Sequence, residues 1–152
     1  GLSLPNVAVP RSMVWDDTLS ESRTREAGEL TTGISFLVSM ATRTVSTTSG
    51  TPQEAGLMIW DPTEFDVFEC RWRSVVSRSG GSGTGLVELY NYTNASVIDS
   101  FTIANGSSFT PHDRAVTLPS TGATRLIGVR LSRASGGGTD LLHASNVRVR
   151  EN

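Results

Sequence analysis

The stretch FECRWRSVVSRSGGSGTGLVELYNYTN, residues 68–94, places two strand-like patterns on either side of a glycine- and serine-rich turn. Successive side chains of a strand point to opposite faces, so the first pattern separates into two sets. One set is mainly apolar and consists of Phe68, Cys70, Trp72, Ser74 and Val76. The other is mostly charged and consists of Glu69, Arg71, Arg73 and Val75. We therefore predict a strand with one face in the core, on which Trp72 is buried.

The turn RSGGSGTG, residues 78–85, is followed by another strand pattern rather than by a helix. Phosphate-binding glycine loops need a helix at that point, because its N-terminal amides face the phosphate. The same arrangement recurs in TRLIGVRLS, RASGGGTD and LLHASNVRVR, which together cover residues 124–150. We predict that the two halves are hairpins of one antiparallel sandwich.

Further strand patterns and frequent turn residues, including 15 glycines, indicate an all-β chain. The best helical candidate, 16–30, has cap residues but no apolar stripe, so we predict a polar loop with at most one helical turn. Eight strands in one domain predict a sandwich or barrel. The predicted strands are 34–41, 56–60, 65–77, 85–92, 96–103, 115–118, 124–132 and 141–150.

Length, charge and cysteine content narrow the function classes. The 152 residues predict one domain, 16–152, after an extended arm at 1–15. The net charge of -2 and the scattered arginines give no reason to expect nucleic acid as a partner. No run approaches the ~18 apolar residues of a membrane span, so no membrane partner is expected. The single Cys70 is predicted to be a small buried hydrophobe.

The patterns FECRWRSVV, GTGLVELYN, TRLIGVRLS and GGGTDLLHASNVRV, within residues 65–150, resemble jelly-roll β-sandwich modules. Such modules occur as carbohydrate-binding modules and as accessory domains on bacteriophage virions. The resemblance implies an antiparallel sandwich of jelly-roll type. It also implies a location on a virion surface or, alternatively, outside the cell.

Nothing in the sequence forms a catalytic or metal-binding motif. The two histidines occur without an HExxH, CxxC or GxSxG pattern, so we expect no catalytic residue, metal site or cofactor. We interpret His112, in the proline-containing segment FTPHDRAV, as a solvated loop residue. His143, in the last strand pattern, is interpreted as a structural residue.

Carboxylates offer the main enzymatic alternative. Asp61, Glu64, Asp66 and Glu69 lie close together in sequence, and glycosidases use a pair of carboxylates. Asp61 before Pro62 is common turn chemistry, however, and Asp66 and Glu69 point to opposite faces of a regular strand. Calcium binding by this cluster together with Asp140 is a further weak alternative, since no DxDxDG-type loop is present.

Aromatic residues bear on glycan binding. Trp60, Tyr90 and Tyr92 are the candidates for exposed rings that contact sugar. A tryptophan at a strand end, such as Trp60, is more often a plug at the edge of a sandwich.

The segment GLSLPNVAVPRSMVW, residues 1–15, is apolar and contains two prolines, which favour an extended chain. Such an arm could pack along its own domain or add to a neighbouring subunit. Its apolar residues are Leu2, Leu4, Val7, Val9 and Met13.

Our first hypothesis is a non-catalytic bacteriophage virion protein, a capsid decoration or fibre/spike domain, whose partners are copies of itself or a capsid or tail protein. The alternatives are a carbohydrate-binding module for a cell-surface glycan and, third, an enzyme.

Overall fold

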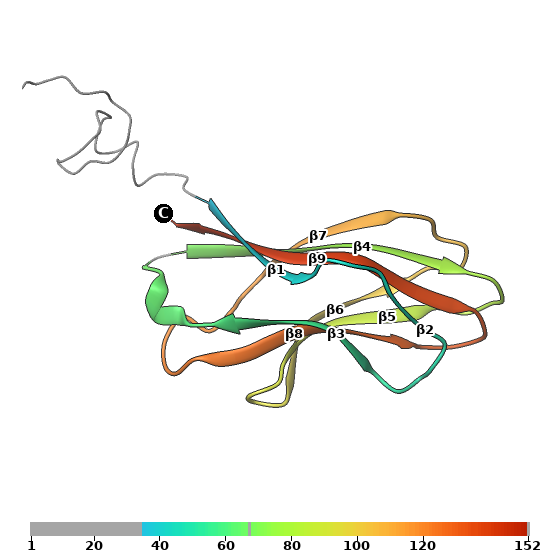
Figure 1. The fold of residues 1–152 in the computed structure, drawn as a ribbon, viewed down its shortest axis with the longest axis horizontal. Helices are drawn as coiled ribbons and strands as arrows, with labels where there is room; N and C mark the ends of the chain where they lie inside the picture. The colour runs from blue at the N-terminus through green and yellow to red at the C-terminus, as the bar shows by residue number, and fades with distance from the viewer. Residues whose placement is uncertain (1–34, 67, 152) are drawn as a thin grey trace, which may run out of the picture. The chain divides into compact units, whose positions relative to one another are not determined.

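The computed structural model describes residues 35–66 and 68–151, which form a sandwich of two antiparallel sheets (Figure 1). Sheet A has the strand order β1 (Ser35–Ala41), β9 (Thr139–Glu151), β4 (Phe68–Ser79) and β7 (Thr110–Val116), and β2 (Val45–Thr47) also pairs with β9. Sheet B has the order β3 (Gln53–Trp60), β8 (Arg125–Arg133), β5 (Gly85–Asn91) and β6 (Ser96–Ile103). A 3-10 turn, η1 (Pro62–Glu64), follows β3. The predicted all-β sandwich is confirmed.

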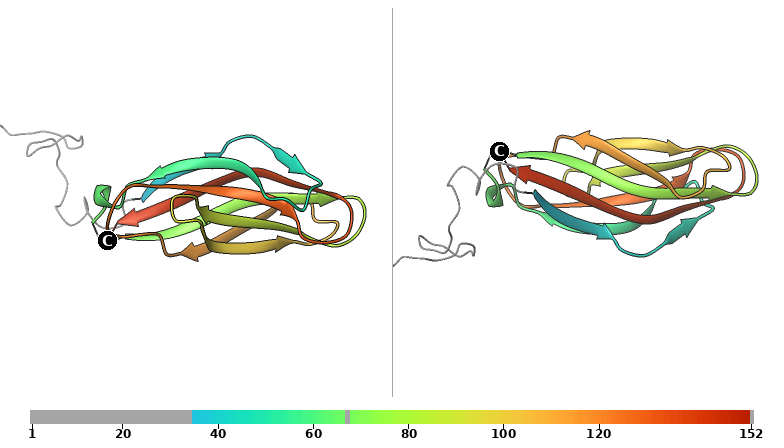
Figure 2. Two further views of the ribbon diagram at one scale, coloured as in Figure 1. Left: turned by 90° about the horizontal axis from the view of Figure 1, so that it is seen from below. Right: turned by 90° about the horizontal axis from the view of Figure 1, so that it is seen from above.

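The connectivity is that of a jelly roll, as expected from the resemblance. In the described residues the first strand pairs with the last, and only β5 and β6 form a hairpin between long consecutive strands. The prediction that β4 and β5, and β8 and β9, are hairpins is wrong, because the members of each pair belong to different sheets. Strand β4 already pairs with β9 and β7, and β5 pairs with β8 and β6 (Figure 2). Neither strand has an edge left for the other.

Most predicted strands lie within a few residues of the observed ones, and β6 matches at both ends. The main departure is β7, which begins at Thr110 rather than at residue 115. Pro111 lies inside it, which is tolerated because β7 is an edge strand and its outer side needs no backbone donor. The interpretation of FTPHDRAV as a loop is therefore wrong. The short strand β2 had no predicted counterpart.

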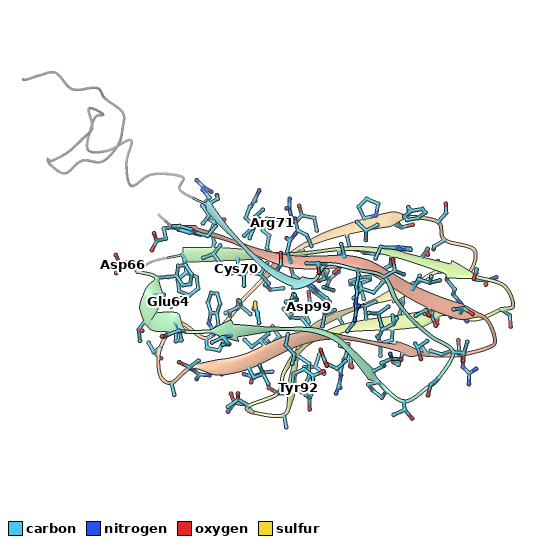
Figure 3. All side chains as sticks on the ribbon, in the orientation of Figure 1. Glu64, Asp66, Cys70, Arg71, Tyr92 and Asp99 are labelled. Carbon is cyan, nitrogen blue, oxygen red and sulfur yellow. The ribbon has the colours of Figure 1, made fainter. Side chains whose placement is uncertain are left out.

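The core lies between the sheets and follows the predicted alternation. Trp72 and Cys70 are 1% and 4% exposed, and the outward residues of the same strand remain partly accessible. Figure 3 shows Cys70 between the sheets and Arg71 on the outer face of sheet A. Burial, with a smaller contribution from Glu69, raises the pKa of the Cys70 thiol to about 11. Cys70 is thus the buried hydrophobe that the sequence predicted.

The two glycine-rich turns are the crossovers β4–β5 and β8–β9, and they pack directly against each other. Gly83 and Gly136 have φ of 83° and 66°, and a Cβ at either would overlap the backbone of the opposite turn. The Arg78 guanidinium lies between the turns, where its Nη2 donates hydrogen bonds to the carbonyl oxygens of Ser82, Ser135 and Gly137. Glycine is required here for close backbone packing.

Candidate functional surfaces

The predicted site residues fall into three groups. The arm residues Leu2, Leu4, Val7, Val9 and Met13 lie outside the described residues, as does the segment 16–30. Trp60 lies in the core. Tyr90 and Tyr92 lie together on the outer face of sheet B.

Trp60 is not a surface residue. Its side chain is 1% exposed, its ring stacks on Phe65 with centroids 5.2 Å apart, and its Nε1 donates a 2.8 Å hydrogen bond to the carbonyl oxygen of Pro119. The prediction of an exposed, sugar-contacting Trp60 is wrong. The alternative, a plug at the end of the sandwich, is confirmed, because the indole fills apolar space and still satisfies its one donor.

The two tyrosines form a half-buried pair on sheet B, where Figure 3 labels Tyr92. Their rings meet edge to face with centroids 5.0 Å apart. The Arg130 guanidinium lies 3.6 Å from the Tyr90 ring centroid and pairs with Glu88 at 2.6 Å. Burial, followed by the charge of Glu54, raises the pKa of Tyr92. One face of Tyr90 is therefore already occupied by a cation.

Aliphatic side chains surround this pair. Strand pairing places Leu57 and Tyr90 on either side of Gly128, and Val97 beyond Tyr90. Ile59 pairs with Leu126 in the neighbouring row, and Ile59 is 75% exposed. We call the resulting apolar area the sheet B surface, and its residues are Leu57, Ile59, Tyr90, Tyr92, Val97 and Leu126.

Charged residues border the sheet B surface on one side. Glu54, Arg130 and Glu88 occupy facing positions on β3, β8 and β5. An apolar centre beside a polar rim is the usual anatomy of a protein interface. The aliphatic members were missed in the sequence, although the alternation in GLMIW already separates Leu57 and Ile59 from the buried Met58 and Trp60.

Two carboxylates of the segment 61–69, Asp61 and Glu69, have separate structural contacts. Asp61 caps η1, where it accepts hydrogen bonds from the Thr63 amide at 2.9 Å and hydroxyl at 2.7 Å, which lower its pKa. Glu69 is on the outer face of sheet A, 3.6 Å from Arg150. Among residues 35–66 and 68–151, no three histidine, cysteine or acidic side chains are placed to hold a metal ion.

The histidines are both strand residues. His112 lies in β7 with its ring stacked on Phe101, centroids 3.8 Å apart, so its interpretation as a solvated loop residue is wrong. Burial, followed by the charge of Arg114, lowers the pKa of His112. His143 is a structural residue of β9, as predicted, and its ring nitrogens bond the hydroxyls of Ser77 and Thr44 at 2.8 and 3.1 Å.

The described part of the chain contains no helix with the length and apolar character that a membrane span requires.

No family model matches the chain, and no curated protein matches it. Among solved structures, the VP2 subviral particle of infectious bursal disease virus is similar at a TM-score of 0.45 and 11% identity, covering 78% of this chain and 32% of that one. The virus of the Gx strain gives 0.45 and 13%, covering 77% and 31%. This chain thus spans about a third of the viral chains.

Carbohydrate-binding domains are similar at the same level. The CBM36-1 domain of a multidomain xylanase from the hindgut metagenome of Trinervitermes trinervoides has a TM-score of 0.48 and 11% identity, covering 76% of this chain and 96% of that one. The CBM22-1 xylan-binding domain from Paenibacillus barcinonensis has 0.42 and 11%, covering 80% and 98%. These distant likenesses extend to the jelly-roll sandwich alone.

Proposed function

We propose that this chain is a non-catalytic structural protein that acts by protein–protein assembly, with its sheet B surface packed against another copy of itself. The supporting observation is the contiguous apolar area around Ile59, which is 75% exposed. Its neighbours Leu57, Val97 and Leu126 are 40%, 47% and 39% exposed. Soluble monomers rarely expose large contiguous apolar patches, and such patches mark interaction sites.

The setting we propose is the surface of a bacteriophage virion, as a capsid decoration or a fibre/spike domain, where a capsid or tail protein would be the further partner. Jelly rolls are building units of viral capsids, and also of lectins. This is an analogy at the level of fold, which does not by itself determine function. The assembly proposal rests on the sheet B surface and is independent of that setting.

Carbohydrate binding by the sheet B surface is the second candidate. The observation in its favour is the Tyr90–Tyr92 pair, which lies at the surface. Three features favour the protein partner instead: both rings are half-buried, they are 75° apart, and exposed aliphatic side chains lie beside them. A sugar ring needs an open, flat aromatic face.

We expect Ile59→Asp to weaken self-association at least about thirtyfold, because a carboxylate at the centre of a desolvated contact costs ~2 kcal/mol or more. Light scattering coupled to size-exclusion chromatography over a dilution series measures this. Leu37→Asp is the matched control, since Leu37 is a 61% exposed aliphatic residue of β1 whose strand position faces Arg148 on sheet A. A wild-type chain that stays monomeric, or equal effects of the two variants, would contradict the proposal.

The arm provides a second test of assembly. We expect deletion of residues 1–13 to leave the melting temperature of the sandwich nearly unchanged while weakening association. The apolar residues of the arm favour burial, yet ordering an extended terminus costs about 1–2 kcal/mol per residue, so it orders only where a groove covers it. Scanning calorimetry and light scattering separate the outcomes. A loss of several kcal/mol of stability without an assembly defect would mean that the arm packs on its own domain.

A further inference from the structure

The outer face of sheet A contains a hollow of about 290 Å³ over β9, β4 and β7. Its floor is a row of side chains with small or apolar groups, Ala144, Val75 and Pro111, which occupy facing positions on the three strands. The next row along the strands is polar and consists of Asn146, Arg73 and Asp113. The hollow thus has an apolar floor and a polar end.

Phe109 lies on the side of the apolar row away from the polar row, two residues before Pro111. Its side chain is 70% exposed, and its φ of 25° is in the left-handed region, which a bulky residue rarely adopts. The ring stacks on His143, with centroids 4.4 Å apart and planes at 28°. His143 is held in turn by the hydroxyls of Ser77 and Thr44. Backbone strain of this kind clusters at active sites and ligand clamps, and here it holds an exposed aromatic ring.

The charge of this face is unbalanced. Arg71 pairs with Asp113 at 2.6 Å, and Arg150 lies near Glu69. Arg73 donates from Nε to the Asn146 side-chain oxygen at 3.2 Å, and neither Arg73 nor Arg148 pairs with a carboxylate among the described residues. The Arg73 guanidinium, at the polar end of the hollow, therefore forms no ion pair with a carboxylate of the described residues, and Asp113 opposite it is already paired with Arg71.

We propose that this hollow binds an acidic saccharide, a glycan unit that carries a carboxylate. A pyranose ring has an apolar C–H face, which suits Phe109 and the floor, and a polar edge, which suits the amide of Asn146. Arg73 recognises the carboxylate, since a guanidinium matches the geometry of that group. Asp113, whose charge is paired with Arg71, can accept hydrogen bonds from sugar hydroxyls. This site is on the opposite sheet from the sheet B surface and is independent of it.

The test begins with the full chain on an array of immobilised oligosaccharides that includes uronate-containing, sialylated and neutral members. We expect acidic members to be bound, and titration calorimetry with the best of them gives the affinity. Phe109→Ala and Arg73→Ala should each weaken binding about tenfold or more, consistent with loss of one stacking or charge-assisted contact. Both side chains are at the surface, so thermal melting should show folded variants.

Two matched controls distinguish this site from other surfaces. Arg150→Ala removes an exposed arginine of the same face outside the hollow, and Tyr92→Ala alters the sheet B surface. Both should leave the affinity within about twofold, because Arg150 lies four residues along β9 from Asn146, away from Phe109, and Tyr92 lies on the other sheet. Binding to no array member, equal binding of neutral sugars, or a loss in Tyr92→Ala without one in Phe109→Ala would each overturn the proposal. Self-association of Phe109→Ala, measured in parallel, should equal that of the wild type, because the assembly proposal rests on the sheet B surface. The two proposals can therefore fail independently.

Discussion

We expect Asp140→Ala to lower the free energy of unfolding by about 3–5 kcal/mol, because it leaves a buried guanidinium without its counter-charge. The side chains of Arg78 and Asp140 are both fully buried, and Arg78 Nη1 lies 2.5 Å from Asp140 Oδ1. Without the carboxylate, the charge between the two crossovers would be stabilised only by the carbonyl oxygens of Ser82, Ser135 and Gly137. Urea denaturation monitored by circular dichroism measures the loss.

The matched control is Asp113→Ala, which removes the partner of Arg71. That pair has a comparable separation of 2.6 Å, but its side chains are 38% and 50% exposed. Surface ion pairs contribute ~0–1 kcal/mol, so the control should unfold close to the wild type. Similar losses in the two variants would mean that the crossovers do not depend on the buried pair.

Local alternation was sufficient to predict which face of β4 is buried, and the same alternation is present in the sequences of β8 and β9. Ile127 and Val149, for example, are fully buried, whereas Arg130 and Arg150 on the alternate positions of the same strands are not. Successive side chains of one strand point in turn to the core and to solvent, so the sequence of that segment alone indicates which of them are buried. The same reasoning assigned Trp72 to the core.

The pairing of strands could not be predicted in this way. The glycine-rich turn after β4 looks like a hairpin turn, because nothing in the segment 68–94 shows that β9 and β7 occupy both edges of β4. Arg78 similarly resembles a solvated residue at the start of a turn. Its burial depends on Asp140, which is 62 residues away in sequence.

The candidate surfaces were only partly predictable for the same reason. Tyr90 and Tyr92 are two residues apart, so their proximity follows from a single strand. The row formed by Leu57, Gly128 and Tyr90 needs three strands in register, and the hollow near Phe109 needs β9, β4 and β7. Such sites are products of sheet order, which the pattern of one strand does not determine.

The second large effect that we expect is a loss of about 3–5 kcal/mol in Trp72→Ala, the usual cost of removing a buried tryptophan. Its ring is 1% exposed and packs on Phe101 with centroids 5.2 Å apart. Its Nε1 also donates a 2.9 Å hydrogen bond to the Ser145 hydroxyl, which is 2.9 Å from the hydroxyl of Ser74. The substitution would therefore open a cavity and break a buried polar contact together.

Trp72→Phe separates the two contributions, because it keeps an aromatic ring against Phe101 and removes the indole donor. We expect it to cost about 1–3 kcal/mol, since one buried hydrogen bond to Ser145 is lost and the remaining space is smaller. Denaturant titrations of both variants, with the slopes compared, give the two free energies. A loss below about 1 kcal/mol in Trp72→Ala would mean that β4 has the inverse orientation, with Arg71 and Arg73 facing the core, because only an exposed position tolerates so large a truncation.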